Sequence, residues 1–133
     1  MEVPRSKQEY AQQRSELAAM YKGVHREVTG CDEPSAKANL ERRFGEKPTI
    51  ADLEGGIAEK VIDHDVPWDR MQDIANERRV SAKTMDSLHE AVSESAMEQA
   101  RDAGYDGLSS GMRRYISDDQ FNALYDAYDA QRG

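Results

Sequence analysis

The stretch DIANERRVSAKTM, residues 73–85, joins two amphipathic segments whose apolar residues recur every three or four positions. That spacing is typical of α-helices, because it places the apolar side chains on one face. Ser81 can cap the second segment with its hydroxyl, and the apolar face then continues to about Ala103. The stretch therefore predicts a short helix over 67–79, a tight turn, and a long helix over 82–103.

Helical spacing recurs along the rest of the chain, in segments that begin at capping residues and mostly end at glycine. The further helices are predicted near 7–29, 33–44, 50–64 and 118–130. Nowhere does the alternation of a half-buried strand persist. The sequence therefore predicts an all-α fold, a compact bundle of five to seven helices with no β-sheet.

Length and charge suggest how the bundle is organised. A chain of 133 residues suits a single domain. Residues 1–48 have nine Lys/Arg and eight Asp/Glu, a net charge of +1, whereas 49–133 have nine and eighteen, a net charge of −9. We interpret 1–45 as a helical hairpin arm and 49–133 as an acidic helical bundle, with the turn GEKPT at 45–49 between them.

Two local features bear on where helices begin and end. Gly55-Gly56 lies inside the predicted 50–64 helix and is expected to weaken or break it, because glycine is unfavourable in a helix interior. The same pair could belong to a phosphate-binding loop, but the lysine and Ser/Thr of such loops are missing. Near Pro67, Asp65 is placed to cap the next helix.

The spacing around residues 73–85 resembles the helix-turn-helix motif of bacterial repressors such as the lac-repressor family. The residues that carry the resemblance are Ile74, Ala75, Asn76-Glu77-Arg78, Arg79, Val80, Ser81, Thr84 and Met85. It covers about 20 residues, and it implies a tri-helical unit in which a small residue lies where two helices cross. Trp68 and Leu88 are expected in the same buried cluster.

The resemblance also implies a contact surface for nucleic acid or another partner. Its candidate residues are Arg78, Arg79, Ser81, Lys83, Asp86, Ser87 and Glu90. Two features depart from typical DNA readers. The turn residue, usually glycine because it needs a positive φ, is Arg79. In addition, Pro67–Val92 contains four basic and five acidic residues, whereas DNA readers carry a basic surplus.

No pattern indicates an enzyme, a metal site or a cofactor. Cys31 is the single cysteine, so an intramolecular disulfide is excluded, and no histidine has the spacing of a zinc helix. The segment Asp63-His64-Asp65 has metal-binding residue types, but a loop at a helix end explains it more simply. No apolar run approaches a membrane span and no signal peptide is evident, so we expect a cytoplasmic protein.

Two functional hypotheses follow from these observations. The first is a small acidic, non-enzymatic interaction protein, an adaptor, regulator or inhibitor of the kind found in phages and mobile elements, that binds a protein partner. The second is a helix-turn-helix transcriptional regulator that contacts DNA through 67–90. In the second case the apolar stripe of 7–44 would serve for homodimerisation.

Overall fold

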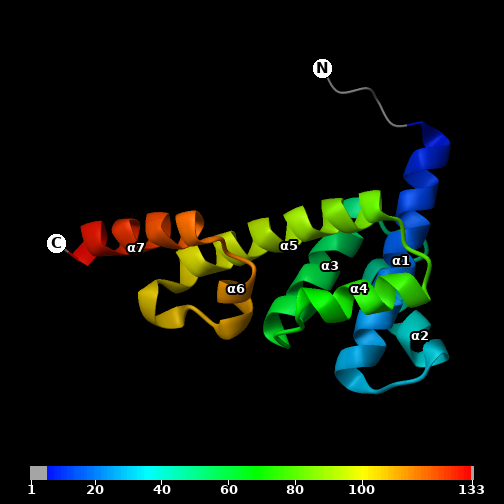
Figure 1. The fold of residues 1–133 in the computed structure, drawn as a ribbon. Helices are drawn as coiled ribbons and strands as arrows, with labels where there is room; N and C mark the ends of the chain where they lie inside the picture. Colours follow the sequence, from blue (N-terminus) through cyan, green and yellow to red (C-terminus); the bar gives the residue numbers. More distant parts are fainter. Residues whose placement is uncertain (1–5, 133) are drawn as a thin grey trace.

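The computed structural model describes residues 6–132, and every regular element within them is helical (Figure 1). The elements are α1 (Lys7–Thr29), α2 (Glu33–Phe44), α3 (Ile50–Asp63), α4 (Trp68–Glu77), α5 (Ala82–Ala103), the 3₁₀ turn η1 (Tyr105–Gly107), α6 (Ser110–Arg114) and α7 (Asp118–Arg132). The all-α prediction is confirmed. The helix bounds predicted from sequence differ from these by at most two residues.

Side-chain caps explain where most helices begin. At the start of α3 the hydroxyl of Thr49 accepts the N–H of Asp52 at 3.0 Å, while the Asp52 carboxylate accepts the N–H of Thr49 at 3.1 Å. This reciprocal pair satisfies two backbone donors that the helix leaves free. Ser117 and Gln120 form the same arrangement before α7. Short polar residues in the sequence therefore determine the helix starts.

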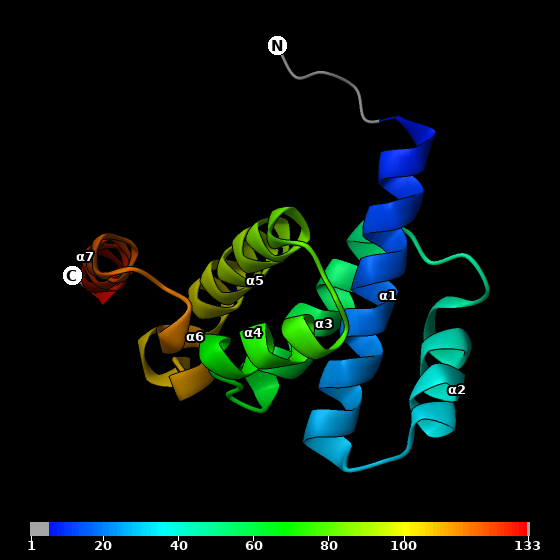
Figure 2. The same cartoon turned by 45° about the vertical axis from the view of Figure 1, so that its right-hand side comes forward.

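The core is built around α3, which lies between α1 and α5 (Figure 2). Residues on the inner faces of these three helices have no exposed surface: Leu17, Met20, Tyr21, Val24, Leu53, Ile57, Val61, Leu88 and Val92. Four of the six residues expected around the helix-turn-helix unit, Ile74, Ala75, Met85 and Leu88, belong to the same buried cluster, whereas Trp68 and Val80 are only partly buried.

The helical hairpin is present, and its first helix belongs to the shared core. α2 packs on α1 through buried Ala36 and Leu40. The inner stripe of α1, however, faces α3, which leaves Tyr10 as the exposed large apolar residue of that helix. α4 crosses α1 closely at Gly23, where a Cβ would lie 2.5 Å from Cγ2 of Ile74. The stripe assigned to dimerisation is therefore largely covered by the chain's own helices.

The C-terminal helices form an arm at the far end of α5 (Figure 1). α6 approaches the end of α3 so closely that a Cβ on Gly111 would lie 2.0 Å from the carbonyl oxygen of Ile62. α7 buries Leu124 and Tyr128, and the Tyr128 hydroxyl donates to the carbonyl of Ala100 on α5. The alanine-rich end of α5 thus allows neighbouring elements to pack closely.

Two expectations about helix boundaries are wrong. Helix α3 continues through Gly55-Gly56 without a break. Gly56 is needed for packing, because a Cβ there would lie 2.7 Å from Cζ of Phe44. Asp65 does not cap α4. It adopts a left-handed conformation (φ +50°) in the turn after α3, and its carboxylate pairs with Arg114 at 2.8 Å.

Candidate interaction surface

The turn between α4 and α5 is tight and is centred on Arg79, the residue that stands where helix-turn-helix proteins usually have glycine. Arg79 is left-handed (φ +57°), and the N–H of Val80 donates to the carbonyl of Ala75 at 2.9 Å. These are features of the Schellman motif that ends many helices. Glycine usually occupies the left-handed position because it carries no Cβ. Here an arginine occupies it, and its side chain is exposed.

Arg78, the first candidate contact residue, is engaged inside the molecule. Its guanidinium donates two hydrogen bonds to the carboxylate of Glu33 at the start of α2, at 3.0 and 2.7 Å. Lys22 and Arg26 lie 3.8 and 3.3 Å from the same carboxylate. The hydrogen bonds from Arg78, with these positive charges, lower the pKa of Glu33 from 4.5 to about 2. Arg78 therefore ties the end of α4 to the start of α2.

Both candidate serines, Ser81 and Ser87, also make internal contacts. The backbone N–H of Ser81 donates to the Glu16 carboxylate of α1, and its hydroxyl caps α5. The hydroxyl of Ser87 donates to Glu54 of α3 at 2.9 Å and accepts from Gln13 of α1 at 3.5 Å. These polar contacts join three helices, and they engage the hydroxyl groups of both serines within the molecule.

The other four candidates, Arg79, Lys83, Asp86 and Glu90, are exposed. Lys83 lines a small hollow between α1 and α5 together with Glu9 and Glu16. The start of α5, where a helix-turn-helix protein would meet phosphates, is thus flanked by carboxylates of α1. The charge of the exposed candidates is balanced, with two cations and two anions.

The exposed side of α5 carries a longer feature that continues from the last two candidates. Carboxylates recur at every fourth residue of the helix: Asp86, Glu90, Glu94, Glu98 and Asp102. We call these five residues the acidic row. Neighbours in the row are separated by a rise of about 6 Å along the helix. All five are exposed, and the row crosses the side of α5 opposite the buried Leu88 and Val92.

No ion pair or side-chain hydrogen bond connects the acidic row to the rest of the described residues. Elsewhere, several arginines form ion pairs with nearby carboxylates. The pairs are Arg43–Glu59, Arg70–Glu27, Arg78–Glu33, Arg113–Asp118 and Arg114–Asp65. These arginines therefore meet separate carboxylates on different elements. None of these ion pairs involves the acidic row.

Glu94, Glu98 and Asp102 were not among the residues proposed from sequence. The helix-turn-helix resemblance covers only the first turns of α5 and ends near Leu88. A signal for the rest of the row was nevertheless present, because acidic residues at four-residue intervals fall on one ridge of a helix. Acidic residues are so frequent in the rest of this chain that the four-residue spacing does not stand out in the sequence.

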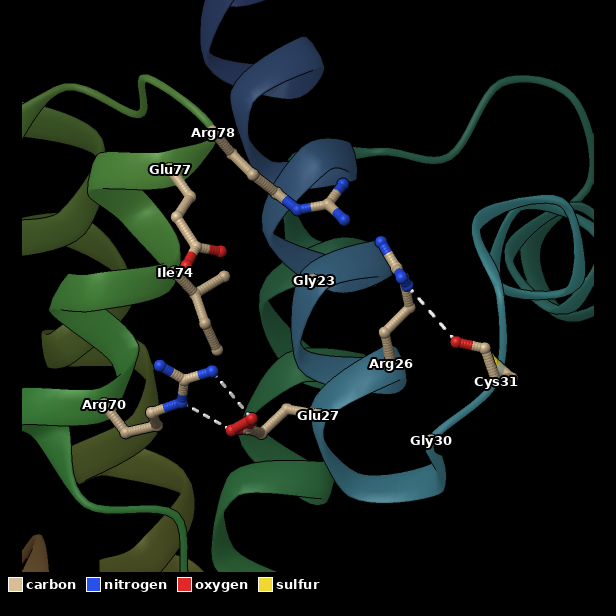
Figure 3. A pocket seen from close by; sticks show the side chains of 9 residues that line it. All are labelled: Gly23, Arg26, Glu27, Gly30, Cys31, Arg70, Ile74, Glu77 and Arg78. Carbon is tan, nitrogen blue, oxygen red and sulfur yellow. Dashed lines mark hydrogen bonds and ion pairs between the residues drawn. The ribbon is translucent and has the colours of Figure 1, made fainter.

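A polar hollow of about 290 Å³ lies between the end of α1 and α4 (Figure 3). Gly23 and Ile74 form its floor, and Arg26, Arg70 and Arg78 reach into it from both helices. Each arginine already contacts a carboxylate: Arg70 binds Glu27, and the other two bind Glu33. The hollow is therefore a polar joint between helices in which every arginine contacts a carboxylate.

Residues 6–132 contain no cluster of three His, Cys, Asp or Glu side chains with the geometry to hold a metal ion. Of the Asp63-His64-Asp65 segment, Asp65 pairs with Arg114, while Asp63 and His64 are exposed. Among the described helices, none combines the length and the apolar character that crossing a bilayer requires.

Comparison with protein-family models, with curated proteins and with solved structures finds no match to this chain.

Proposed function

We propose that this chain is a small acidic, non-enzymatic interaction protein that binds a basic protein partner through the acidic row of α5. The observation that carries the proposal is the row itself, five exposed carboxylates on one rigid helix with no cation paired to them. A complementary positive surface would steer the two proteins together and fix their register. An adaptor, regulator or inhibitor would act in this way.

The energetics of α5 support the proposal. Like charges four residues apart on a helix are destabilising by about 0.2–0.5 kcal/mol per pair. The row contains four such pairs, and the two cations on the same side of the helix, Lys83 and Arg101, form no ion pair with it among the described residues. A basic partner would relieve this repulsion, so the charge that disfavours the free helix would favour the complex.

A DNA-binding regulator is the second candidate, supported by the residue spacing of 73–85 and by the left-handed Arg79 in the turn between α4 and α5. The charge around that turn favours the first candidate. Arg78 is bound to Glu33, and Glu16 occupies the start of α5. Lys83 alone would face phosphates beside Asp86 and Glu90, and carboxylates repel a phosphate backbone.

A charge-matched pair of variants tests the proposal. The first variant neutralises the row with Asp86→Asn, Glu90→Gln, Glu94→Gln and Glu98→Gln. The control variant neutralises four other exposed carboxylates without recorded partners, through Glu41→Gln, Glu46→Gln, Asp63→Asn and Asp106→Asn. Binding of a fluorescent nona-lysine peptide is measured by anisotropy at low and moderate salt. Random-sequence duplex DNA is titrated in parallel.

The wild type should bind the peptide with an affinity that falls as salt rises. The row variant should lose about tenfold or more, since each surface ion pair contributes about 0.2–1 kcal/mol, and the control variant should lose much less. Equal losses in both variants would mean that net charge alone attracts the peptide. Clear binding of the wild type to DNA, strengthened by Asp86→Asn and weakened by Lys83→Ala, would support the helix-turn-helix regulator instead.

A further inference from the structure

Three aromatic rings meet where α4, α5 and the end of α6 come together. The ring of Trp68 contacts that of His89 edge-on, with centroids 4.6 Å apart, and lies 6.2 Å from that of Tyr115. Tyr115 is buried, and its hydroxyl donates to the carbonyl of Val66 at 2.5 Å. This contact fixes the ring that supports Trp68. The other two rings reach the surface: Trp68 is partly buried and His89 is exposed.

The two surface rings lie beside the start of the acidic row. His89 comes three residues after Asp86 and one before Glu90, so it occupies the neighbouring ridge of α5 on the side of α4. Asp69 follows Trp68 on α4 and is exposed as well. Exposed carboxylates therefore stand on both helices next to the partly buried Trp68 and the exposed His89.

We propose that Trp68 and His89 anchor an arginine side chain from an arginine-rich segment of the basic partner. The inference rests on the proposed function, and it adds the place and the chemistry of the central contact.

Arginine fits this corner better than lysine for a geometric reason. A guanidinium is planar, so it stacks on an aromatic face while its N–H groups point outward to carboxylates. Lysine presents a compact, strongly hydrated charge that gains less from a ring. Tryptophan is also the aromatic residue that most favours a cation above its face. Trp68, the only tryptophan in the chain, is also of a residue type that is enriched among the residues that dominate binding at protein interfaces.

The test compares two labelled peptides of equal length and charge, nona-arginine and nona-lysine, each titrated into the full chain at low salt. Anisotropy of the label reports binding, and the emission of Trp68 reports whether the peptide reaches the aromatic pair. We expect nona-arginine to bind about two- to fivefold more tightly than nona-lysine, and to change the Trp68 emission more strongly. His89→Ala should lower the ratio of the two affinities, because it removes one of the two rings of the anchor.

His64→Ala is the matched control, because His64 is also exposed but makes no recorded ring contact; it should leave the ratio unchanged. Equal affinities of the two peptides for the wild type, with Trp68 emission unaltered, would overturn the aromatic anchor and leave the acidic row as the docking surface. Failure of both peptides to bind would remove the proposed function and this inference together. Circular dichroism of each variant confirms that it is folded before its affinity is interpreted.

Discussion

Arg78 and Glu33 lie 45 residues apart in sequence, and they meet through two parallel hydrogen bonds that tie the end of α4 to the start of α2. Arg78 is the more buried of the two, with 18 % of its side chain exposed, against 43 % for Glu33. Paired guanidinium and carboxylate groups of this kind are directional as well as charged. The contact holds α2, which otherwise packs mainly on α1.

The first prediction concerns the stability of the fold at low pH. Because the folded-state pKa of Glu33 is about 2 and its ordinary value is 4.5, the stabilisation it provides is complete above about pH 5 and is lost as the pH falls toward 2. Glu33→Gln should therefore lower the urea midpoint at pH 7, and its difference from the wild type should shrink at low pH. A difference that stays constant from pH 7 to 2 would contradict the assignment. Glu41→Gln on the exposed side of α2 serves as the control.

A second prediction compares two neighbouring glycines in α3. A Cβ on Gly55 would meet nothing within 4 Å, whereas one on Gly56 would lie 2.7 Å from Phe44 and 3.1 Å from Tyr21. Gly55→Ala should stabilise the protein by about 0.5–1 kcal/mol, the usual gain in a helix interior. Gly56→Ala should destabilise it by about 1–3 kcal/mol through overpacking. Thermal melts that rank the two variants in the opposite order would show that the α2–α3 packing is misassigned.

Gly111 provides a more severe case, because a Cβ would collide with backbone. The nearest atom, the carbonyl oxygen of Ile62, would lie at 2.0 Å and cannot rotate away as a side chain can. Gly111→Ala should cost about 3 kcal/mol or more and should increase amide hydrogen exchange in α6 first. Ser110→Ala, one residue earlier and exposed, should leave the exchange pattern of α6 close to that of the wild type.

The left-handed turn at Arg79 predicts a gain in stability. Holding a residue with a side chain at φ +57° costs free energy that glycine does not incur. Arg79→Gly should therefore raise the free energy of unfolding by about 1 kcal/mol, measured by urea titration. An unchanged or lower stability would indicate that the exposed Arg79 side chain makes a contact that offsets the strain. Arg79→Lys, which keeps both the charge and the strain, should match the wild type.

The acidic row predicts opposite effects on stability and binding. Glu94 has an acidic neighbour four residues away on each side, Glu90 and Glu98, so Glu94→Gln removes two repulsive pairs. The free protein should gain about 0.4–1 kcal/mol while its affinity for nona-lysine falls. Calorimetric melts and anisotropy on the same variant check both signs. A loss of stability would mean that Glu94 has a favourable contact in the folded chain.

Helix positions could be predicted from the sequence because caps and apolar spacing act locally. Ser81 and Thr49 begin helices by bonding residues three positions away, and such signals need no tertiary information. The break predicted at Gly55-Gly56 is wrong because the role of Gly56 depends on tertiary packing. Glycine in a helix is unfavourable locally, but Gly56 makes room for Phe44, a residue 12 positions earlier in the chain. Long-range packing of this kind leaves no trace in local spacing.

The candidate surface was predictable only in part. Asp86 and Glu90, two of the candidates named from the sequence, are exposed, but the engagement of Arg78 depends on Glu33, which lies on a different helix. Asp65 was misassigned because a cap and a left-handed turn residue favour the same short polar side chains. Which carboxylates remain unpaired becomes visible only when the positions of all the arginines are known.

Helix α5 is held along its length by the core on one side, and this has a consequence for the thermodynamics of association. Its carboxylates are fixed at regular intervals before any partner arrives, so the conformational entropy of ordering the backbone is lost during folding and not during binding. We therefore expect the amide exchange rates of α5 to change little when a basic peptide binds. Association should be limited mainly by the partner's own ordering, so a rigid basic surface should bind more tightly than a flexible tail of equal charge.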